Sequence, residues 1–442
     1  MSVPHVGVGL IGFGTIGTGV ARVLRQNADV IEQRLGFPLR LVRIADLDTE
    51  RDRGVDLAGV HFDSDAEGLI EDPEVSIVVE LIGGYDIARR LTLRALERGK
   101  HVVTANKALL ALHGKELFEA ARAASVDIAF EASVGGGIPV LRSIREGLNA
   151  NRIESLYGIM NGTTNYVLTE MEKTGEAFEV VLKRAQELGY AEADPTFDVD
   201  GVDAAHKLTL LAAMAFGVEF TFKEIPTEGI RGLLPLDFEA AKEFGYRIKL
   251  LGVAKRSEGP GGEDRIEARV QPTMIPRDSL LANVDGAMNA IAVQGDAVGP
   301  TLFYGAGAGE LPTASAVVAD LIELAREVRR GTSGRVAPLS YLPEALEPRP
   351  LVPLAELEGR LYLVFTAEDR PGVLGQITTI LGEHGVSLAS VIQQRSEGGD
   401  GVPVVVLTHP AVEGAVRAAL AEIDDMPEVL APTRLVRIEE EL

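Results

Sequence analysis

The chain has 442 residues, 46% hydrophobic and 25% charged, which is a globular composition too long for one ordinary domain. Its net charge of −23 repels phosphate backbones, which excludes nucleic acid as an expected partner. The sequence contains no cysteine, and this excludes disulfides, thiolate zinc sites and cysteine nucleophiles.

The first residues lack the basic start and apolar core of a signal peptide, and no run of about 18 apolar residues follows. We therefore expect a cytoplasmic protein with no membrane partner. In the first third of the chain, short apolar runs alternate with helical patterns. Strands are predicted at 6–11, 39–45, 77–81, 101–104 and 128–131, and helices at 17–36, 86–99 and 114–124. This alternation predicts an α/β fold in which residues 1–138 form a Rossmann-type, doubly wound parallel sheet.

A glycine-rich turn joins the first predicted strand to the first predicted helix. It reads Gly12-Phe13-Gly14-Thr15-Ile16-Gly17. The first glycine permits a tight turn, the second lets a pyrophosphate approach the backbone, and the third lets helix and strand pack closely. Its position between strand and helix favours dinucleotide binding over an ordinary glycine turn.

Asp46 ends the second predicted strand, where an acid commonly binds the adenine ribose hydroxyls and favours NAD. Its distance from the glycines exceeds the usual spacing of about 20 residues. Arg40 and Arg43 also lie close in sequence. NAD and NADP therefore both remain candidate cofactors, and a solvated turn acid remains the alternative for Asp46.

The middle of the chain predicts an α+β domain at 139–310. Helical patterns cover 139–149, 164–172, 176–188 and 201–216, and two strands at 247–255 and 265–273 flank the turn at 258–262. A further helix at 311–330 is expected to pack back on the first domain. Five prolines between 338 and 353 then predict a linker at 331–357.

Residues 358–442 predict a ferredoxin-like β-α-β-β-α-β module. Its strands are expected at 360–366, 387–394, 402–408 and 433–438, with helices at 372–384 and 411–423.

Two places carry residues suited to proton transfer. Lys107 follows the strand at 101–104, and ligands meet an open parallel sheet at such strand ends. Asp203 and Lys207 are four residues apart on a predicted helix, so they share a face. A lysine held by a carboxylate can move a proton, but a surface lysine and a solvated ion pair remain the alternatives.

The segment around this pair resembles homoserine dehydrogenases. Residues 189–207 match the family pattern G-x-A-E-x-D-P-x-x-D-x-x-G-x-D-x-x-x-K at every fixed position. Residues 161–166, Asn-Gly-Thr-Thr-Asn-Tyr, and the glycine-rich loop at 304–309 followed by Pro312-Thr313-Ala314 also resemble the family. The likeness covers residues 5–330.

The resemblance implies a role for each matching residue. Glu192 would bind the substrate's amino group and Asp198 would shape the pocket with Asp203, while Lys207 and Lys107 would surround the reacting hydroxyl, with Lys207 as acid/base. Cofactor contacts would come from Phe13, Thr15, Ile16, Lys107 and Gly307. A monovalent cation, sodium in relatives, would bind at Glu131, Val134, Gly136 and Ile138.

The C-terminal module resembles ACT domains through 369–375, Asp-Arg-Pro-Gly-Val-Leu-Gly, and 385–388 after the helix. ACT domains commonly pair edge to edge and bind amino acids at their interface. Glycine permits close approach and a helix N-terminus attracts a carboxylate, which predicts a regulatory site at Asp369, Gly372 and Val373. A purely oligomerising role is the alternative.

The resemblance implies reversible oxidation of L-homoserine to L-aspartate 4-semialdehyde with NAD(P), in threonine, methionine and isoleucine biosynthesis. Threonine is the expected effector, and a homodimer or homotetramer is the expected assembly. An aldehyde-oxidising semialdehyde dehydrogenase would need a thiol that the chain lacks. The other alternative is a catalytically inactive, dinucleotide-binding amino-acid sensor, but that function does not require Lys107, Glu192 and Lys207, all of which are present.

Overall fold

A computed structural model describes residues 5–219, 222–259, 261–393 and 401–442. Pro260 of the predicted turn and the end of the strand predicted at 387–394 lie outside these residues. The chain forms two compact units. The first comprises Met1–Gly162, Asp203–Ile225 and Met288–Arg349, and the second comprises Thr163–Val202, Pro226–Ala287 and Pro350–Leu442.

The first unit contains a six-stranded parallel sheet with the order β3-β2-β1-β4-β5-β6. Its strands are β1 Val6–Ile11, β2 Leu39–Ala45, β3 His61–Asp63, β4 Ile77–Glu80, β5 His101–Thr104 and β6 Ile128–Ala129. β1, β4 and β5 are buried along their whole length, as expected for strands covered on both faces. This strand order is that of the Rossmann fold, which confirms the predicted class.

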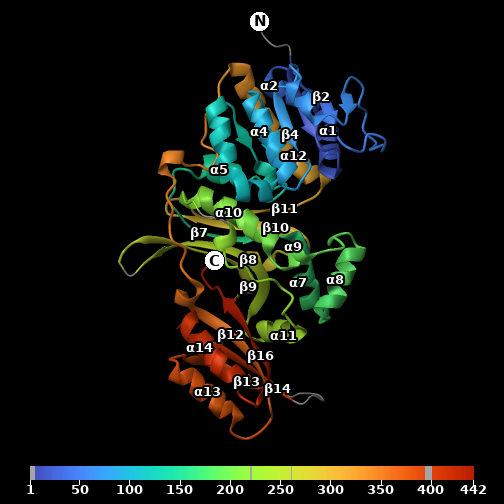
Figure 1. Cartoon of the computed structure of the whole chain (residues 1–442). Coiled ribbons are helices and arrows are strands. Elements are labelled where there is room, and N and C mark those ends of the chain that lie inside the picture. Colours follow the sequence, from blue (N-terminus) through green and yellow to red (C-terminus); the bar gives the residue numbers. More distant parts are fainter. Residues whose placement is uncertain (1–4, 220–221, 260, 394–400) are drawn as a thin grey trace. The chain divides into compact units, whose positions relative to one another are not determined.

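Helices cover this sheet. They are α1 Thr15–Gln26, α2 Ala28–Leu35, α3 Ala66–Glu71, α4 Asp86–Glu97, α5 Lys107–Ala124 and α12 Glu310–Arg330. Figure 1 shows the orange α12 among the blue elements of this sheet, and its Val317 and Leu321 share a core with Val20 of α1. The prediction that this late helix packs back on the first domain is therefore confirmed.

Two helix predictions and one strand prediction in this region are wrong at their boundaries. The helix predicted at 17–36 is two helices, because Asn27 leaves helical geometry with ψ at 19°. The helix predicted at 114–124 begins at Lys107, because the side chain of Asn106 caps it by accepting from Leu109 N–H. The strand predicted at 128–131 ends at Ala129, and Glu131 begins a short 3-10 turn.

Three strands of the first unit run antiparallel in the order β11-β10-β7, and the sequence patterns do not predict them. They are β7 Ile153–Ile159, β10 Met288–Gly295 and β11 Gly299–Ala306. The sequence of β11 lacks the hydrophobic pattern of a strand, because β11 is only partly buried and begins with Gly299-Pro300. The region predicted as a helix at 139–149 is a short α6, Val140–Arg142, continued by a π-turn at Ser143–Gly147.

The second unit contains the helices α7 Gly162–Thr174, α8 Phe178–Glu187, α9 Thr196–Val199 and α11 Pro235–Glu243, and a long hairpin of β8 Tyr246–Glu258 and β9 Asp264–Pro276. The hairpin confirms the predicted strand pair. Helix α10, Val202–Phe216, follows α9 directly in the chain.

The C-terminal module lies in the second unit and has the predicted β-α-β-β-α-β order. Its elements are β12 Glu358–Ala367, α13 Val373–Glu383, β13 Leu388–Gln393, β14 Val402–Thr408, β15 Ala411–Val412, α14 Glu413–Asp424 and β16 Val429–Ile438. The main strands are antiparallel in the order β16-β12-β14-β13, and both helices pack on them over one core (Figure 1). β16 also pairs in parallel with β9, so this sheet continues into the hairpin.

The proline-rich segment at 331–357 is fastened to each unit. Glu347 exchanges backbone hydrogen bonds with Gly217 and Glu219 of the first unit, at 3.2 Å each. In the second unit, Ile266 N–H donates to the Pro350 carbonyl at 3.2 Å, and the Ile266 carbonyl accepts from Val352 N–H at 2.9 Å. Short 3-10 turns lie within it at Pro343–Ala345 and Leu354–Glu356, and elsewhere at Phe222–Glu224 and Leu281–Asn283.

Candidate active site

The glycine turn after β1 has the geometry that a dinucleotide pyrophosphate needs. Gly12 has φ at +96°, and a Cβ there would lie 2.7 Å from the Leu81 carbonyl. A Cβ at Gly17 would lie 2.2 Å from the Gly12 oxygen, so helix α1 can approach the strand only with glycine there. Gly14 has open space around its Cβ position and, like Thr15, is exposed at the N-terminus of α1. The turn therefore presents backbone to solvent at the positive end of a helix.

Asp46 and Arg53 together hold this turn, and Arg53 was not singled out from the sequence. The Asp46 carboxylate accepts Phe13 N–H at 2.5 Å and contacts Arg53 Nη2 at 3.5 Å. Arg53 also donates to the Phe13 carbonyl at 2.7 Å and lies 5.0 Å from the centre of the Phe13 ring. That ring is buried against Phe62, so Phe13 faces the site only through its backbone. Arg43 is instead paired with acids of its own, Asp63 the nearest at 2.7 Å.

The two predicted lysines meet at one carboxylate. Lys207 Nζ lies 2.7 Å from Asp203 Oδ2, and Lys107 Nζ lies 3.1 Å from Asp203 Oδ1. Lys107 reaches Asp203 from the first residue of α5, directly after β5, while Asp203 and Lys207 stand one turn apart on α10. The Lys207 and Asp203 side chains are 10% and 4% exposed, against 32% for Lys107. The cluster is therefore a buried ion pair with one lysine open to solvent.

Asp203 is held as a carboxylate. Burial alone would raise its pKa, but the ammonium groups of Lys207 and Lys107 and the hydrogen bonds from Lys207 and Asn161 lower the pKa of Asp203 well below its usual range. With Asp203 ionised, two lysines and one acid leave a net positive charge. Such a charge stabilises an oxygen that becomes negative during a reaction.

The loop after β7 completes the cluster. Asn161 Nδ2 donates to Asp203 Oδ2 at 2.8 Å, and Lys207 Nζ donates to the Met160 carbonyl at 2.7 Å. Asn161 is the first residue of the Asn-Gly-Thr-Thr-Asn-Tyr motif, and this motif was the available signal for it. Asn165 of the same motif has a structural role instead, because its amide binds the Val284 and Gly286 carbonyls.

Glu192 and Asp198 belong to the second unit. The Glu192 side chain is exposed, and Gln186 Nε2 holds its carbonyl at 3.0 Å. Asp198 is part-buried in α9, and its carbonyl accepts Gly201 N–H at 3.0 Å in a turn where Gly201 has φ at +82°.

The predicted cation segment and the late glycine loop lie against each other. A Cβ at Gly136 would lie 2.5 Å from the Gly307 oxygen, and Gly137 N–H donates to Ala306 at 3.0 Å. The buried Glu131 carboxylate accepts the amides of Leu141 at 3.0 Å and Arg142 at 2.7 Å, so it already caps α6. Burial, with repulsion from Asp320, raises the pKa of Glu131 to about 7.

The predicted regulatory residues line a cavity of about 280 Å³ in the C-terminal module. Asp369, Gly372 and Val373 share it with Arg370 and Gln393. Gly372 has φ at +96° and directly precedes α13, and Asp369 accepts Gln393 Nε2 at 3.3 Å. The cavity is slightly smaller than the 300–1,000 Å³ or so that is usual for drug-sized ligands.

Comparison with known proteins assigns the regions of the chain. Residues 12–131 match the NAD-binding domain of homoserine dehydrogenase, residues 139–322 match the homoserine dehydrogenase family and residues 361–425 match the ACT domain. The homoserine dehydrogenase of Pseudomonas aeruginosa is 48% identical over 436 residues, covering 98% of this chain and 99% of that protein.

The chain belongs to the homoserine dehydrogenase family.

Solved members of the homoserine dehydrogenase family share its fold. The structure from Thiobacillus denitrificans aligns with a TM-score of 0.92 and 48% identity, covering 99% of this chain and 98% of that one. A Staphylococcus aureus structure aligns with a TM-score of 0.75 and 30% identity over 99% of both chains. Membership makes the chain an NAD(P)-dependent homoserine dehydrogenase of amino-acid biosynthesis with an ACT domain. Among the described residues, no helix has the length and apolarity needed to span a membrane.

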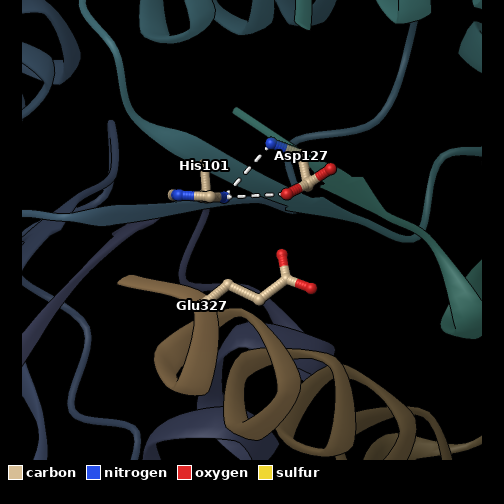
Figure 2. A group of neighbouring side chains, drawn as sticks. All are labelled: His101, Asp127 and Glu327. Atoms are coloured by element: carbon tan, nitrogen blue, oxygen red, sulfur yellow. Dashed lines mark hydrogen bonds and ion pairs between the residues drawn. The ribbon is translucent and has the colours of Figure 1, made fainter. Parts of the chain in front are cut away.

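A second polar cluster, not part of any motif of the homoserine dehydrogenase family identified above, consists of His101, Asp127 and Glu327 (Figure 2). His101 is the first residue of β5, so it lies at the end of that strand opposite to Lys107. His101, Asp127 and Glu327 bring an imidazole and two carboxylates within 4.8 Å of one another, donor types that metal sites use. Asp127 N–H donates to His101 Nδ1 at 3.1 Å, and Gly334 N–H donates to Asp127 at 2.9 Å. Burial, with Asp127 beside it, raises the pKa of Glu327 to about 8. The Asp127 amide occupies Nδ1 of the imidazole, and Glu327 of α12 lies beside both residues, so the cluster links α12 to this edge of the sheet.

Proposed function

We propose that Lys207 carries the hydroxyl proton of homoserine and that Lys107 and Asp203 orient it. The observation that supports this most is the single Asp203 carboxylate between both lysines. Bound NAD(P) would supply the hydride acceptor. In the direction of oxidation Lys207 would enter the step as the neutral amine and accept the proton from the hydroxyl, and in reduction its ammonium form would return that proton to the aldehyde oxygen. The net positive charge of the cluster would stabilise the intermediate alkoxide.

Glu192 and Asp198 are proposed to bind the substrate's ammonium group and to shape its pocket. The support is that both stand in the matched 189–207 segment and that the turn holding Asp198 leads directly into α10. A carboxylate is the natural partner of an ammonium group.

Glu192→Gln is expected to raise the KM for homoserine at least about tenfold, because a charge-assisted hydrogen bond contributes about 1.5–3 kcal/mol. The KM for the dinucleotide should stay nearly unchanged. Initial-rate kinetics with each substrate varied in turn measures both constants. Glu187→Gln, a neighbouring acid outside the motif, is the control. An equal loss of affinity for both substrates would remove Glu192 from the homoserine site.

NAD or NADP would bind at Gly12, Phe13, Gly14, Thr15, Ile16 and Gly17, with Asp46, Lys107 and Gly307 close to it. The open backbone at Gly14 is what fits a pyrophosphate. Asp46 suits the ribose hydroxyls of NAD, whereas the Arg53 guanidinium beside it suits a 2′-phosphate. Initial rates with NAD and with NADP decide between them.

A sodium ion is proposed at the carbonyls of Val134, Gly136 and Ile138 and the Glu131 carboxylate. The tight turn at Gly135 and Gly136, with φ at +75° and +52°, is consistent with carbonyls gathered in one place. The Glu131 carboxylate already accepts two backbone hydrogen bonds, so it would have to bind the sodium ion in addition to those amides. Activity in sodium against tetramethylammonium salts tests the site.

The ACT domain is proposed to bind threonine in the cavity beside Gly372 and to reduce activity. The open N-terminus of α13 suits the amino acid's carboxylate, and Asp369 suits its ammonium group. The β13 edge, with Val391 38% exposed, suits pairing with a second copy, which supports the homodimer or homotetramer. Sedimentation of the full chain measures that assembly.

Gly372→Val is expected to abolish inhibition by threonine, because φ at +96° disfavours any side chain and the new one would enter the cavity. The measurement is the ratio of rates with and without threonine, and wild type should show a coupling of about 5- to 150-fold in affinity. Gly375→Ala, on the first turn of the same helix, should respond like wild type. If Gly372→Val is inhibited at the wild-type threonine concentration, the effector binds elsewhere.

A further inference from the structure

A cluster of four charged residues joins the ACT domain to the catalytic part of the second unit. Arg437 on β16 and Arg417 on α14 both pair with Glu413 at the start of α14, at 2.5 and 2.7 Å. Both arginines also reach Glu228, at 3.0 and 3.3 Å. Glu413 and Arg437 are almost wholly buried, whereas Glu228 is 40% exposed. Glu228 is therefore the member through which this cluster contacts residues outside the ACT domain.

The segment that carries Glu228 is firmly attached to β9. Glu228 N–H donates to the Val270 carbonyl at 2.8 Å, and Val270 N–H donates to the Pro226 carbonyl at 2.9 Å. β9 is also the strand that pairs with β16 of the ACT domain. A displacement of β16 would therefore reach this segment through both the backbone and the ion pairs.

The next residues pack directly on the turn that holds Asp198. Ile230 N–H donates to the Val199 carbonyl at 2.9 Å, and both side chains are fully buried. A Cβ at Gly229 would lie 2.4 Å from the same carbonyl, so no side chain separates the two segments. Arg231 Nε completes the contact by pairing with Asp200 at 2.6 Å. The turn then enters α10, which carries Asp203 and Lys207.

We propose that Glu228 is a positioning residue through which the ACT domain sets the geometry of the 196–201 turn. Its effect on homoserine binding rests on the proposed role of Asp198 in the substrate pocket. The ion pairs with Arg417 and Arg437 fix the 226–231 segment, and that segment fixes the turn by backbone contact. Loss of the Glu228 charge loosens the segment by removing its side-chain attachment to the ACT domain, while its backbone hydrogen bonds to β9 remain. The core is not emptied, because Arg437 keeps Glu413 as its partner.

The test compares wild type with Glu228→Gln, which keeps the shape of the side chain and removes its charge. Amide hydrogen exchange in peptides covering 196–201 is expected to be at least about 5-fold faster in the variant, the lower limit of typical coupling. The KM for homoserine should rise by a similar factor, while kcat and the dinucleotide KM stay within about twofold. Arg417→Gln should act in the same direction and should not add to Glu228→Gln. Asp264→Asn, which breaks a comparably exposed pair with Arg256 at the other end of β9, should behave like wild type.

Unchanged exchange at 196–201 in Glu228→Gln overturns the proposal, as does strict additivity with Arg417→Gln. Faster exchange with an unchanged homoserine KM supports the positioning role and overturns the substrate role of the turn instead. Glu192→Gln then distinguishes failure of the positioning role from failure of the proposed substrate site, because this variant changes the homoserine KM only if the proposed substrate site is right.

Discussion

Lys207→Ala is expected to lower kcat by at least about 100-fold, since a positioned proton carrier contributes about 10²–10⁴-fold. The effect should fall on kcat and on kcat/KM alike, because the proton moves only as the transition state is reached. Dinucleotide affinity should be little changed, because the glycine turn belongs to β1 and α1 while Lys207 belongs to α10. Steady-state rates and titration of bound dinucleotide by fluorescence measure the two quantities.

Lys115→Ala is the matched control for this variant. Lys115 is 68% exposed on α5 and pairs only with a surface acid, Glu219, among the described interactions. Its loss should leave kcat within about twofold of wild type. If the kcat of Lys207→Ala lies within tenfold of the wild-type kcat, another group carries the proton. In that case Lys107→Ala, measured in parallel, should show the larger loss of kcat.

Asp203→Asn has the second largest expected effect. The variant keeps the size of the side chain but leaves two ammonium groups facing each other beside a neutral amide. Removing one partner of a buried pair costs about 3–5 kcal/mol, and the lower end applies because Lys107 is partly open to solvent. We expect kcat to fall at least about 100-fold, since neither lysine keeps its orientation, and the melting temperature to fall as well.

Calorimetry and initial rates measure these two losses in Asp203→Asn. Asp56→Asn, which breaks an exposed pair with Arg25, should change neither. If Asp203→Asn lowers the melting temperature but keeps a normal kcat, Asp203 is a structural residue and not part of the proton-transfer site.

Local sequence signals predicted the parts of the site that a few neighbouring residues determine. The glycine turn and the i,i+4 placement of Asp203 and Lys207 follow from spacing alone, and the structure contains both. The contact of Lys107 with Asp203 could not follow in this way, because it joins the end of β5 to a helix far along the chain. The resemblance placed both lysines at the hydroxyl, but spacing gave no reason for a shared carboxylate.

Other features escaped prediction because long-range packing determines them. Arg53 belongs to no motif, yet its position over Phe13 and beside Asp46 places it at the glycine turn. Strands β7 and β10 are mostly buried without clean alternation, and β11 has no fully buried residue, so none of the three shows the alternating pattern of a half-buried strand with a buried face. The predicted domain boundaries stay predictions, because the two compact units each combine segments from distant parts of the chain.

The parallel pairing of β16 with β9 bears on how the proposed inhibition through the ACT domain could be removed. Deleting the C-terminal module would uncover an unpaired strand edge at Thr273 and Met274, and it would leave Arg269 and Lys255 without the Glu439 carboxylate. A bare edge strand can pair with other chains, so the shortened protein would be prone to aggregation. A single substitution in the proposed effector cavity, such as Gly372→Val, is therefore a better test of that inhibition than truncation.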